Sequence, residues 1–162
     1  MVDLISTRTM DITKLAMDGL MTRQKAITAN TANVMTPGYQ RKEITFENQL
    51  QEIVEKDDLK NYIKEQNSME YNPTSLDAIM GRTEKPELTV QQAKYLQSNV
   101  YGNFAPQILD DTVSGSDATG NNVEMEKEVM DMAKVGNQYN VLARLEAKSV
   151  KIIAGAIKGD IA

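Results

Sequence analysis

The residues of this chain that could take part in catalysis are carboxylates, and the side chains that usually work with them are absent. Three pairs of acidic residues lie close together in the sequence: Asp57 with Asp58, Asp110 with Asp111, and Glu124 with Glu128. The chain has no histidine and no cysteine, which excludes imidazole acid–base catalysis, Ser-His and Cys-His nucleophiles and zinc fingers. We interpret the two aspartate pairs as solvated surface charge and the two glutamates as the acidic first turn of a helix. The sequence therefore predicts no catalytic residue.

Motifs that hold cofactors, metal ions or nucleic acid are also missing from the sequence. No phosphate-binding loop of the form G-x-x-x-x-G-K-[ST] occurs. Residues 117–121 resemble the start of a calcium loop but lack the glycine at its sixth position and the closing glutamate. The formal net charge of −5 argues against binding to nucleic acid, and no apolar run reaches the roughly 18 residues needed to span a membrane. We expect no cofactor, no metal ion, no nucleic acid and no direct membrane insertion.

The prolines separate the parts of the chain that can form long helices from the part that cannot. All four prolines lie between residues 37 and 106, and a proline inside a helix removes a hydrogen bond and clashes with the preceding turn. We predict a mainly α fold with long N- and C-terminal helices packed as a coiled-coil-like pair, and a less regular middle segment containing one or two short helices. The expected divisions are an N-terminal helix at 1–36, the middle segment at 37–112, a flexible loop at 113–122 and a C-terminal helix at 123–159.

The expected C-terminal helix carries apolar residues at seven-residue spacing, as a coiled coil does. One row contains Met125, Met132, Tyr139 and Ile153, with Leu142 beside it, and a second row contains Val129, Gly136, Ala143, Val150 and Ile157. We interpret this stripe as an assembly surface. Asn121 or Asn122 is expected to cap the start of the helix, because asparagine accepts hydrogen bonds from the first free N–H groups.

The expected N-terminal helix has a similar repeat, in Ile5, Ile12, Gly19 and Ala26. Glycine lowers helix propensity by about 1 kcal/mol relative to alanine, so Gly19 indicates either a packing reason or a local weak point of the helix. The small side chains at positions 19, 26 and 29 leave room for a second helix to approach closely.

Residues 30–39 are expected to end this helix in a turn. Pro37 disfavours helical backbone at Thr36, and Pro37 followed by Gly38 fits the second and third positions of a type II turn, the third of which requires a positive φ. Asn30 and Asn33 lie on the last turns of the helix, although asparagine is a poor helix former. We expect their amides to make hydrogen bonds across a helix–helix interface and so to fix its register.

Both ends of the chain resemble bacterial flagellar rod and hook proteins. The first signature of that family reads approximately A-N-N-I-A-N-x-x-T-P-G-[YF], and it is matched here by Asn30, Ala32, Asn33, Thr36, Pro37, Gly38 and Tyr39. Residues 41–47 (RKEITFE) look like the run that follows it in the proximal rod proteins. Residues 120–129, which include Asn121 and Asn122, are similar to a second signature, G-N-N-V-D-x-x-x-E-M. The first signature is shared by the whole family, and the second selects the proximal rod proteins.

This resemblance implies a structural subunit of the proximal rod of the bacterial flagellar basal body, which assembles by helix packing into the drive shaft that transmits motor torque to the hook. It implies as partners further copies of the chain, other flagellar rod proteins and the protein that joins the rod to the membrane ring. It also implies passage through the flagellar export apparatus into the periplasmic space. No cleaved signal peptide is expected, because charged residues interrupt the first twenty positions: Asp3, Arg8, Asp11, Lys14 and Asp18.

Two other classes of function stay open at this point. One is a helical secretion-system or adaptor subunit outside the flagellum, which needs the long helices but neither end signature. The other is an enzyme that uses carboxylates alone, which the missing histidine, cysteine and cofactor motifs disfavour.

Overall fold

The computed structural model describes residues 8–68, 80, 89–112 and 114–158, and their contacts separate into two units. The first unit is formed by the two ends of the chain, up to Leu50 and from Phe104 onwards, and the second by residues Gln51–Asn103. The mainly α fold class with long terminal helices is confirmed.

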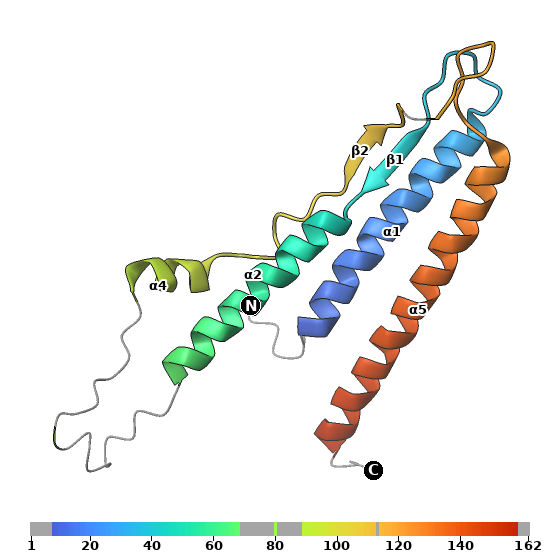
Figure 1. The fold of residues 1–162 in the computed structure, drawn as a ribbon. Helices are drawn as coiled ribbons and strands as arrows, with labels where there is room; N and C mark the ends of the chain where they lie inside the picture. Colours follow the sequence, from blue (N-terminus) through green and yellow to red (C-terminus); the bar gives the residue numbers. More distant parts are fainter. Residues whose placement is uncertain (1–7, 69–79, 81–88, 113, 159–162) are drawn as a thin grey trace. The chain divides into compact units, whose positions relative to one another are not determined.

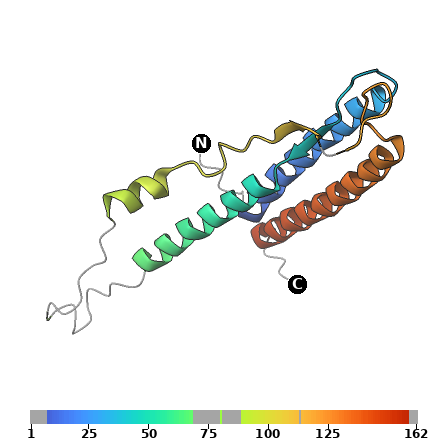
Figure 2. The same cartoon turned by 45° about the horizontal axis from the view of Figure 1, so that its top comes forward.

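Two antiparallel helices form the body of the first unit. Helix α1 spans Arg8–Ala32 and helix α5 spans Met125–Lys158, and they lie side by side in both views (Figures 1 and 2). Strands β1 (Lys42–Thr45) and β2 (Gln107–Asp110) form a two-stranded antiparallel sheet in which Ile44 is paired with Ile108. The strand β1 packs against α1, so the sheet and α5 both depend on α1 for their position.

The apolar core of the first unit lies where α1, β1 and α5 meet. Its buried residues are Leu20, Ile27, Ile44, Phe46 and Val135, and Met132, Tyr139 and Leu142 pack against them half-buried. Phe46 and Phe104 meet edge-on, with ring centroids 6.2 Å apart. Burial of a large apolar side chain contributes about 1.5–3 kcal/mol, so these few residues supply much of the unit's stability.

The glycine in α1 accommodates an aromatic ring. A Cβ atom added at Gly19 would lie 2.6 Å from the ring of Phe46, closer than real side chains come. The guanidinium of Arg23, one turn further along α1, lies over the same ring at 4.7 Å from its centroid. The expectation that the small residues of α1 admit a second helix is therefore wrong for Gly19, whose missing side chain admits Phe46.

The apolar stripe of α5 divides between two environments. Met132, Tyr139 and Leu142 from the first row face the core. In the second row, Val129 is 60% exposed and Ile157 is 73% exposed, and nothing lies within 4 Å of a Cβ built at Gly136. One face of α5 thus closes the subunit, and the second row is exposed except at Ala143, which is half-buried.

The middle segment contains two helices in the described part of the chain. Helix α2 spans Glu47–Ser68 and helix α4 spans Val90–Gln97. A capping box starts α4, in which Thr89 and Gln92 each bond the other's backbone N–H. Within the second unit, the Tyr95 hydroxyl donates to the carbonyl of Lys56 on α2 at 3.1 Å, and Lys60 of α2 donates to the carbonyl of Ser98.

Two glycine-to-alanine substitutions are expected to have opposite effects on stability. Gly19→Ala gains helix propensity but forces the ring of Phe46 to move, which costs about 1–3 kcal/mol. Gly136→Ala meets nothing and should stabilise the chain by about 0.5–1 kcal/mol. Urea unfolding followed by circular dichroism measures both. A Gly19→Ala chain more stable than wild type would show that the contact with Phe46 is not tight.

Candidate functional site

The turn after α1 has the conformation that the sequence predicts. The Tyr39 N–H donates to the carbonyl of Thr36 at 3.2 Å, and Gly38 has φ of 72°, as the third position of a type II turn requires. The N–H of Gly38 in turn donates to the carbonyl of Thr119 at 3.0 Å. The turn that ends the N-terminal helix is therefore joined directly to the loop that precedes the C-terminal helix.

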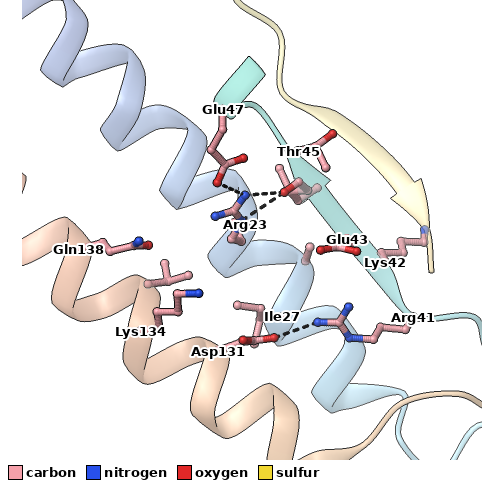
Figure 3. Close-up of a pocket in the computed structure, with 13 residues that line it drawn as sticks. Arg23, Ile27, Arg41, Lys42, Glu43, Thr45, Glu47, Asp131, Lys134 and Gln138 are labelled. Atoms are coloured by element: carbon pink, nitrogen blue, oxygen red, sulfur yellow. Dashed lines mark hydrogen bonds and ion pairs between the residues drawn. The ribbon is translucent and has the colours of Figure 1, made fainter. Parts of the chain in front are cut away.

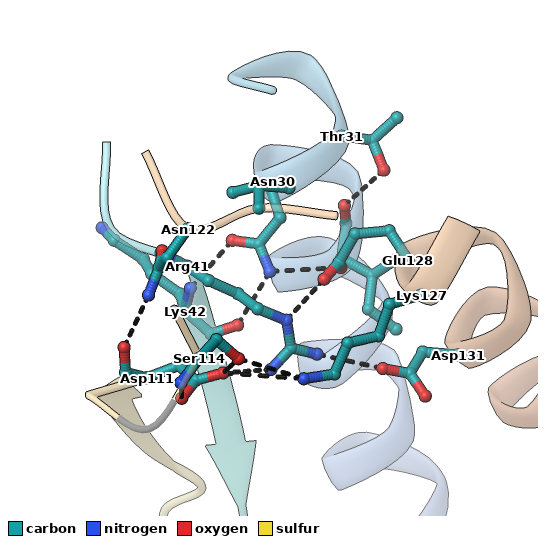
Figure 4. A network of polar contacts seen from close by, with 12 residues as sticks. Asn30, Thr31, Arg41, Lys42, Asp111, Ser114, Asn122, Lys127, Glu128 and Asp131 are labelled. Atoms are coloured by element: carbon teal, nitrogen blue, oxygen red, sulfur yellow. Dashed lines mark hydrogen bonds and ion pairs between the residues drawn. The ribbon is translucent and has the colours of Figure 1, made fainter. Parts of the chain in front are cut away.

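A buried arginine lies at the centre of the contacts between the two ends of the chain (Figure 4). The Nε of Arg41 donates to Oε1 of Glu128 at 2.6 Å, its Nη1 to Oδ2 of Asp111 at 3.2 Å, and its Nη2 to Oδ2 of Asp131 at 2.9 Å. The side chain of Arg41 is 6% exposed, that of Asp111 6% and that of Glu128 0%. We call these four residues, with Asn30 and Asn122, the Arg41 cluster.

This geometry corrects the interpretation of two acidic pairs. Asp111 was expected to be solvated and Glu128 to belong to an acidic first turn, but both are buried because Arg41 neutralises them. Asp57 of the other aspartate pair is also buried, at 8% exposure. Asp58, Asp110 and Glu124 are exposed, as the sequence predicts.

Asn30 is fully buried and joins three elements of the first unit (Figure 4). Its amide nitrogen donates to the carbonyl of Lys42 at 2.9 Å and to Oε2 of Glu128 at 3.2 Å. Its amide oxygen accepts from the N–H of Lys42 at 2.9 Å and from the hydroxyl of Tyr39 at 3.3 Å. All four hydrogen-bonding positions of the amide are used, so Asn30 makes the cross-helix bond predicted for it. The side chain of Asn33 bonds only its neighbours Ala29 and Thr36 among the described residues, so the cross-helix bond predicted for it is not formed there.

The second signature supplies two asparagines that bind the first signature. The amide of Asn122 accepts from the N–H of Arg41 and donates to the carbonyl of Asp111. The amide nitrogen of Asn121 lies 2.9–3.0 Å from three carbonyl oxygens just after α1, those of Asn33, Val34 and Thr36. These carbonyls belong to the turn that follows Ala32, the last residue of α1, and those of Asn33 and Thr36 also accept backbone N–H groups within the turn. The amide of Asn121 therefore holds this turn against the loop before α5.

The predicted N-cap of α5 is therefore wrong. Helix α5 starts at Met125, and the N–H of Glu128 donates to the carbonyl of Glu124. Neither Asn121 nor Asn122 reaches the free N–H groups of α5, because the side chain of Asn121 bonds the turn after α1 and that of Asn122 bonds Arg41 and Asp111. Both asparagines join the loop before α5 to residues 33–41 and do not cap α5.

The loop before α5 has a hydrogen-bonded turn of its own. The carboxylate of Asp117 accepts from the N–H and hydroxyl of Thr119 and from the N–H of Asn121, at 2.6–3.0 Å. These bonds to the charged form lower the pKa of Asp117, led by the Thr119 hydroxyl. Gly120 has φ of 81°. The turn presents Asn121 to α1, while the flexibility predicted for residues 113–122 stays a prediction.

Burial and charge have opposing effects on the titration of Arg41. Burial by itself lowers its pKa, but the hydrogen bond and charge of Glu128, followed by those of Asp111, outweigh burial and raise it. The pKa of Tyr39 is also raised, first by burial and then by the charges of Glu128 and Asp110. Three carboxylates thus surround one guanidinium, and Lys127, 3.8 Å from Asp111, adds a second positive charge at the edge.

The structure brings some predicted site residues together and separates others. Asn30, Tyr39, Asn121 and Asn122 meet in or beside the cluster. Met132, Tyr139 and Leu142 pack on the core, whereas Met125 is 39% exposed. The sequence analysis did not identify Arg41, Asp111, Glu128 or Asp131 as site residues. A signal for two of them was present, since Arg41 and Glu128 lie inside the runs that resemble the rod proteins.

A cavity of about 280 Å³ lies beside the cluster, between α1, β1 and α5 (Figure 3). Arg23 lines it but is already bound to the carbonyl of Ile44 at 2.7 Å and to Glu47 at 2.6 Å.

Within the described residues, no group of three or more histidine, cysteine, aspartate or glutamate side chains is placed to hold a metal ion. None of the described helices is both long enough and apolar enough to cross a membrane.

Comparison with known proteins supplies one informative match. No protein-family model matches the chain. The chain is 24% identical over 149 residues to the flagellar basal body rod protein FlgB of Borreliella burgdorferi, and the match covers 90% of this chain and 95% of that protein. The chain is similar to FlgB. This confirms the resemblance that the two end signatures indicate. The match to FlgB covers 149 residues and so includes most of the chain between the two end signatures.

Removal of the arginine is expected to destabilise this FlgB-like chain strongly. Arg41→Met leaves the buried carboxylates of Glu128 and Asp111 without a counter-charge, which costs about 3–5 kcal/mol. Arg144→Met, at an exposed position of α5, should change stability by less than about 0.5 kcal/mol. Urea unfolding at neutral pH measures both. Equal effects of the two substitutions would show that the cluster contributes little to stability.

Valine at the glycine of the turn is expected to strain the backbone. Gly38→Val places a β-branched residue at a φ of 72°, which costs about 1–3 kcal/mol. Gly115→Val is the control, because Gly115 does not have a positive φ and nothing lies within 4 Å of its Cβ position. Thermal unfolding measures the difference. Equal melting temperatures for the two variants would contradict the type II turn.

The tyrosine beside the cluster is expected to make stability depend on pH in the alkaline range. Because its folded-state pKa lies above the ordinary 10.0, Tyr39 contributes stability that is present below pH 10 and is lost as the pH rises through the raised pKa. Tyr39→Phe loses the hydrogen bond to Asn30, worth about 0.5–1.5 kcal/mol, but also loses this pH dependence. The stability difference between wild type and variant should therefore shrink above pH 10. A constant difference from pH 8 to 11 would contradict the shift.

Proposed function

We propose that this chain is a structural subunit of the proximal rod of the bacterial flagellar basal body and is not an enzyme. In this role it assembles by helix packing into the drive shaft that transmits motor torque to the hook. The observation that supports this best is the meeting of the two end signatures in the Arg41 cluster. The match to FlgB over 90% of the chain supports the same conclusion.

The cluster suits a protein that carries mechanical load. A torque applied along the rod tends to slide α1 and α5 past one another, because they are long and antiparallel and meet mainly through apolar packing along their length. Sliding would separate Arg41 from Glu128 and Asn121 from the turn after α1. Hydrogen bonds between charged groups are short and directional, so the cluster fixes the register of the two helices far better than apolar packing would.

The second row of α5 is the surface that we assign to contacts with neighbouring subunits. Val129, Val150 and Ile157 are 60%, 48% and 73% exposed, and Gly136 leaves space for the close approach of another helix. In this view the signature residues Asn30, Asn33 and Thr36 to Tyr39, with Asn121 and Asn122, hold the subunit together. Assembly contacts then come from α5, where Met125 and Ile153 border the exposed row.

The remaining features of the proposal follow from this role. Residues 1–36 and 123–159 form the axial core domain, joined by the middle segment 37–112 and the loop 113–122. The neighbours are further copies of the chain, other flagellar rod proteins and the protein that joins the rod to the membrane ring. The chain passes through the flagellar export apparatus and acts in the basal body, in the periplasmic space.

A matched pair of substitutions on α5 tests the assembly surface. Val129→Asp places a charge in the exposed second row, and Val141→Asp places the same charge roughly 120° around the helix, at a similarly exposed position. Both chains should fold, because neither valine is in the core. In a strain that lacks the native gene, Val141→Asp should restore swimming and Val129→Asp should not, because a buried charge opposes helix packing.

The readouts distinguish a failure of assembly from a failure of export. The Val129→Asp chain should still be exported but should be absent from isolated basal bodies. Normal swimming with Val129→Asp would overturn the assignment of this row to assembly. Normal swimming in a strain that lacks the whole gene would overturn the proposed rod function itself.

A further inference from the structure

The outer edge of β2 is an unprotected strand edge. All four residues of β2 are exposed, including Ile108 at 61% and Leu109 at 48%. The opposite edge of the sheet is closed, because Asn30 bonds both the N–H and the carbonyl of Lys42, and Arg23 bonds the carbonyl of Ile44. A free edge with apolar side chains is a template for pairing with another strand.

The register of the sheet identifies the free backbone groups of β2. The N–H of Asp111 donates to the carbonyl of Arg41, and hydrogen-bonded pairs alternate along an antiparallel ladder. Leu109 therefore bonds to β1, whereas the N–H and carbonyl groups of Ile108 and Asp110 point away from it. These four groups have no hydrogen-bond partner among the described residues. Their spacing fits one further antiparallel strand.

We propose that β2 pairs with β2 of a second copy of this chain, antiparallel and about a two-fold axis at Leu109. In this register Ile108 of each copy is paired with Asp110 of the other, so that all four free groups form hydrogen bonds. Leu109 meets Leu109 of the second copy in a non-hydrogen-bonded pair, where side chains lie closest. The two small sheets become one sheet of four strands.

The strand is complementary to itself in this register and less so in the neighbouring ones. A pairing centred on Asp110 places two carboxylates directly opposite one another, which is destabilising. A pairing centred on Ile108 sets Asp110 against Pro106 of the other copy, which has no N–H to donate. These comparisons favour the Leu109 register. The occupant is a second copy because its β2 presents the same four free backbone groups in reverse order and an exposed Leu109 to meet Leu109.

The pairing does not rest on the proposed rod function, and it has a consequence for it. Two copies related by a two-fold axis point in opposite directions. The pair is therefore a form of the free chain, and it must open before copies can join an assembly in which all of them point the same way.

The absence of cysteine from the chain makes this register directly testable. In Leu109→Cys the two sulfurs meet across a pair whose Cα atoms lie about 4.5 Å apart, within the range of a disulfide. In Ile108→Cys the two cysteines are diagonal neighbours at roughly 7–8 Å, beyond that range. Each full-length variant is oxidised with copper-phenanthroline and examined by non-reducing electrophoresis. We expect a disulfide-linked dimer from Leu109→Cys and its loss in Ile108→Cys.

Random collision predicts the opposite order, because Ile108 is the more exposed of the two. Equal cross-linking, faster cross-linking at position 108, or no dimer from either variant would overturn the proposal.

A second pair of variants removes or keeps one outward N–H group. Adding Ile108→Pro to Leu109→Cys removes the N–H of residue 108, which points away from β1, and should abolish the dimer. Adding Ile108→Thr instead keeps that N–H and should retain the dimer. Circular dichroism checks that the proline variant is folded. If it is not, the comparison of positions 108 and 109 decides alone.

Discussion

A buried guanidinium cannot give up its charge, and the rest of the first unit is arranged to satisfy Arg41. Arginine stays protonated in proteins, so its burial is tolerated only if acceptors surround it on several sides. Here the acceptors come from the end of β2, from the first turn of α5 and from one turn further along α5. The helices can adopt only the register that brings these three carboxylates to one point. Apolar packing has no such directional requirement, whereas the charged hydrogen bonds of the cluster do.

The asparagines extend this constraint to the backbone. Asn30 satisfies the edge of β1 that no strand covers, and Asn121 bonds the turn after α1. In each case a side-chain amide supplies partners for backbone groups, because it can donate and accept at once. The end of α1, β1 and the loop before α5 are therefore held together by side-chain amides.

Local features of this fold and the pairing of its two long helices could be predicted from the sequence, and the partners of its charged residues could not. Pro37 and Gly38 specify a turn through their own backbone preferences, and the prolines and the apolar repeats locate the helices. Arg41 and Glu128 are 87 residues apart, and a charged residue considered alone is usually on the surface, so Asp111 and Glu128 were misinterpreted. Asn121 was assigned to the nearest helix for the same reason. Asparagine does favour hydrogen bonds to unpaired backbone groups, but this preference does not say which backbone groups in the fold the amide will meet, and here they are those of Asn33 and Thr36.

The aromatic contact between Phe46 and Phe104 has a consequence for how much this chain can vary. The two rings lie at the points where the chain leaves the first unit and returns to it. Since these points are adjacent, the residues between them close a loop whose ends are already held together. The entropy cost of such a loop rises only slowly with its length. The segment can therefore be lengthened, shortened or exchanged for another domain at little cost to the unit that anchors it, and it is a natural position for an inserted tag or reporter.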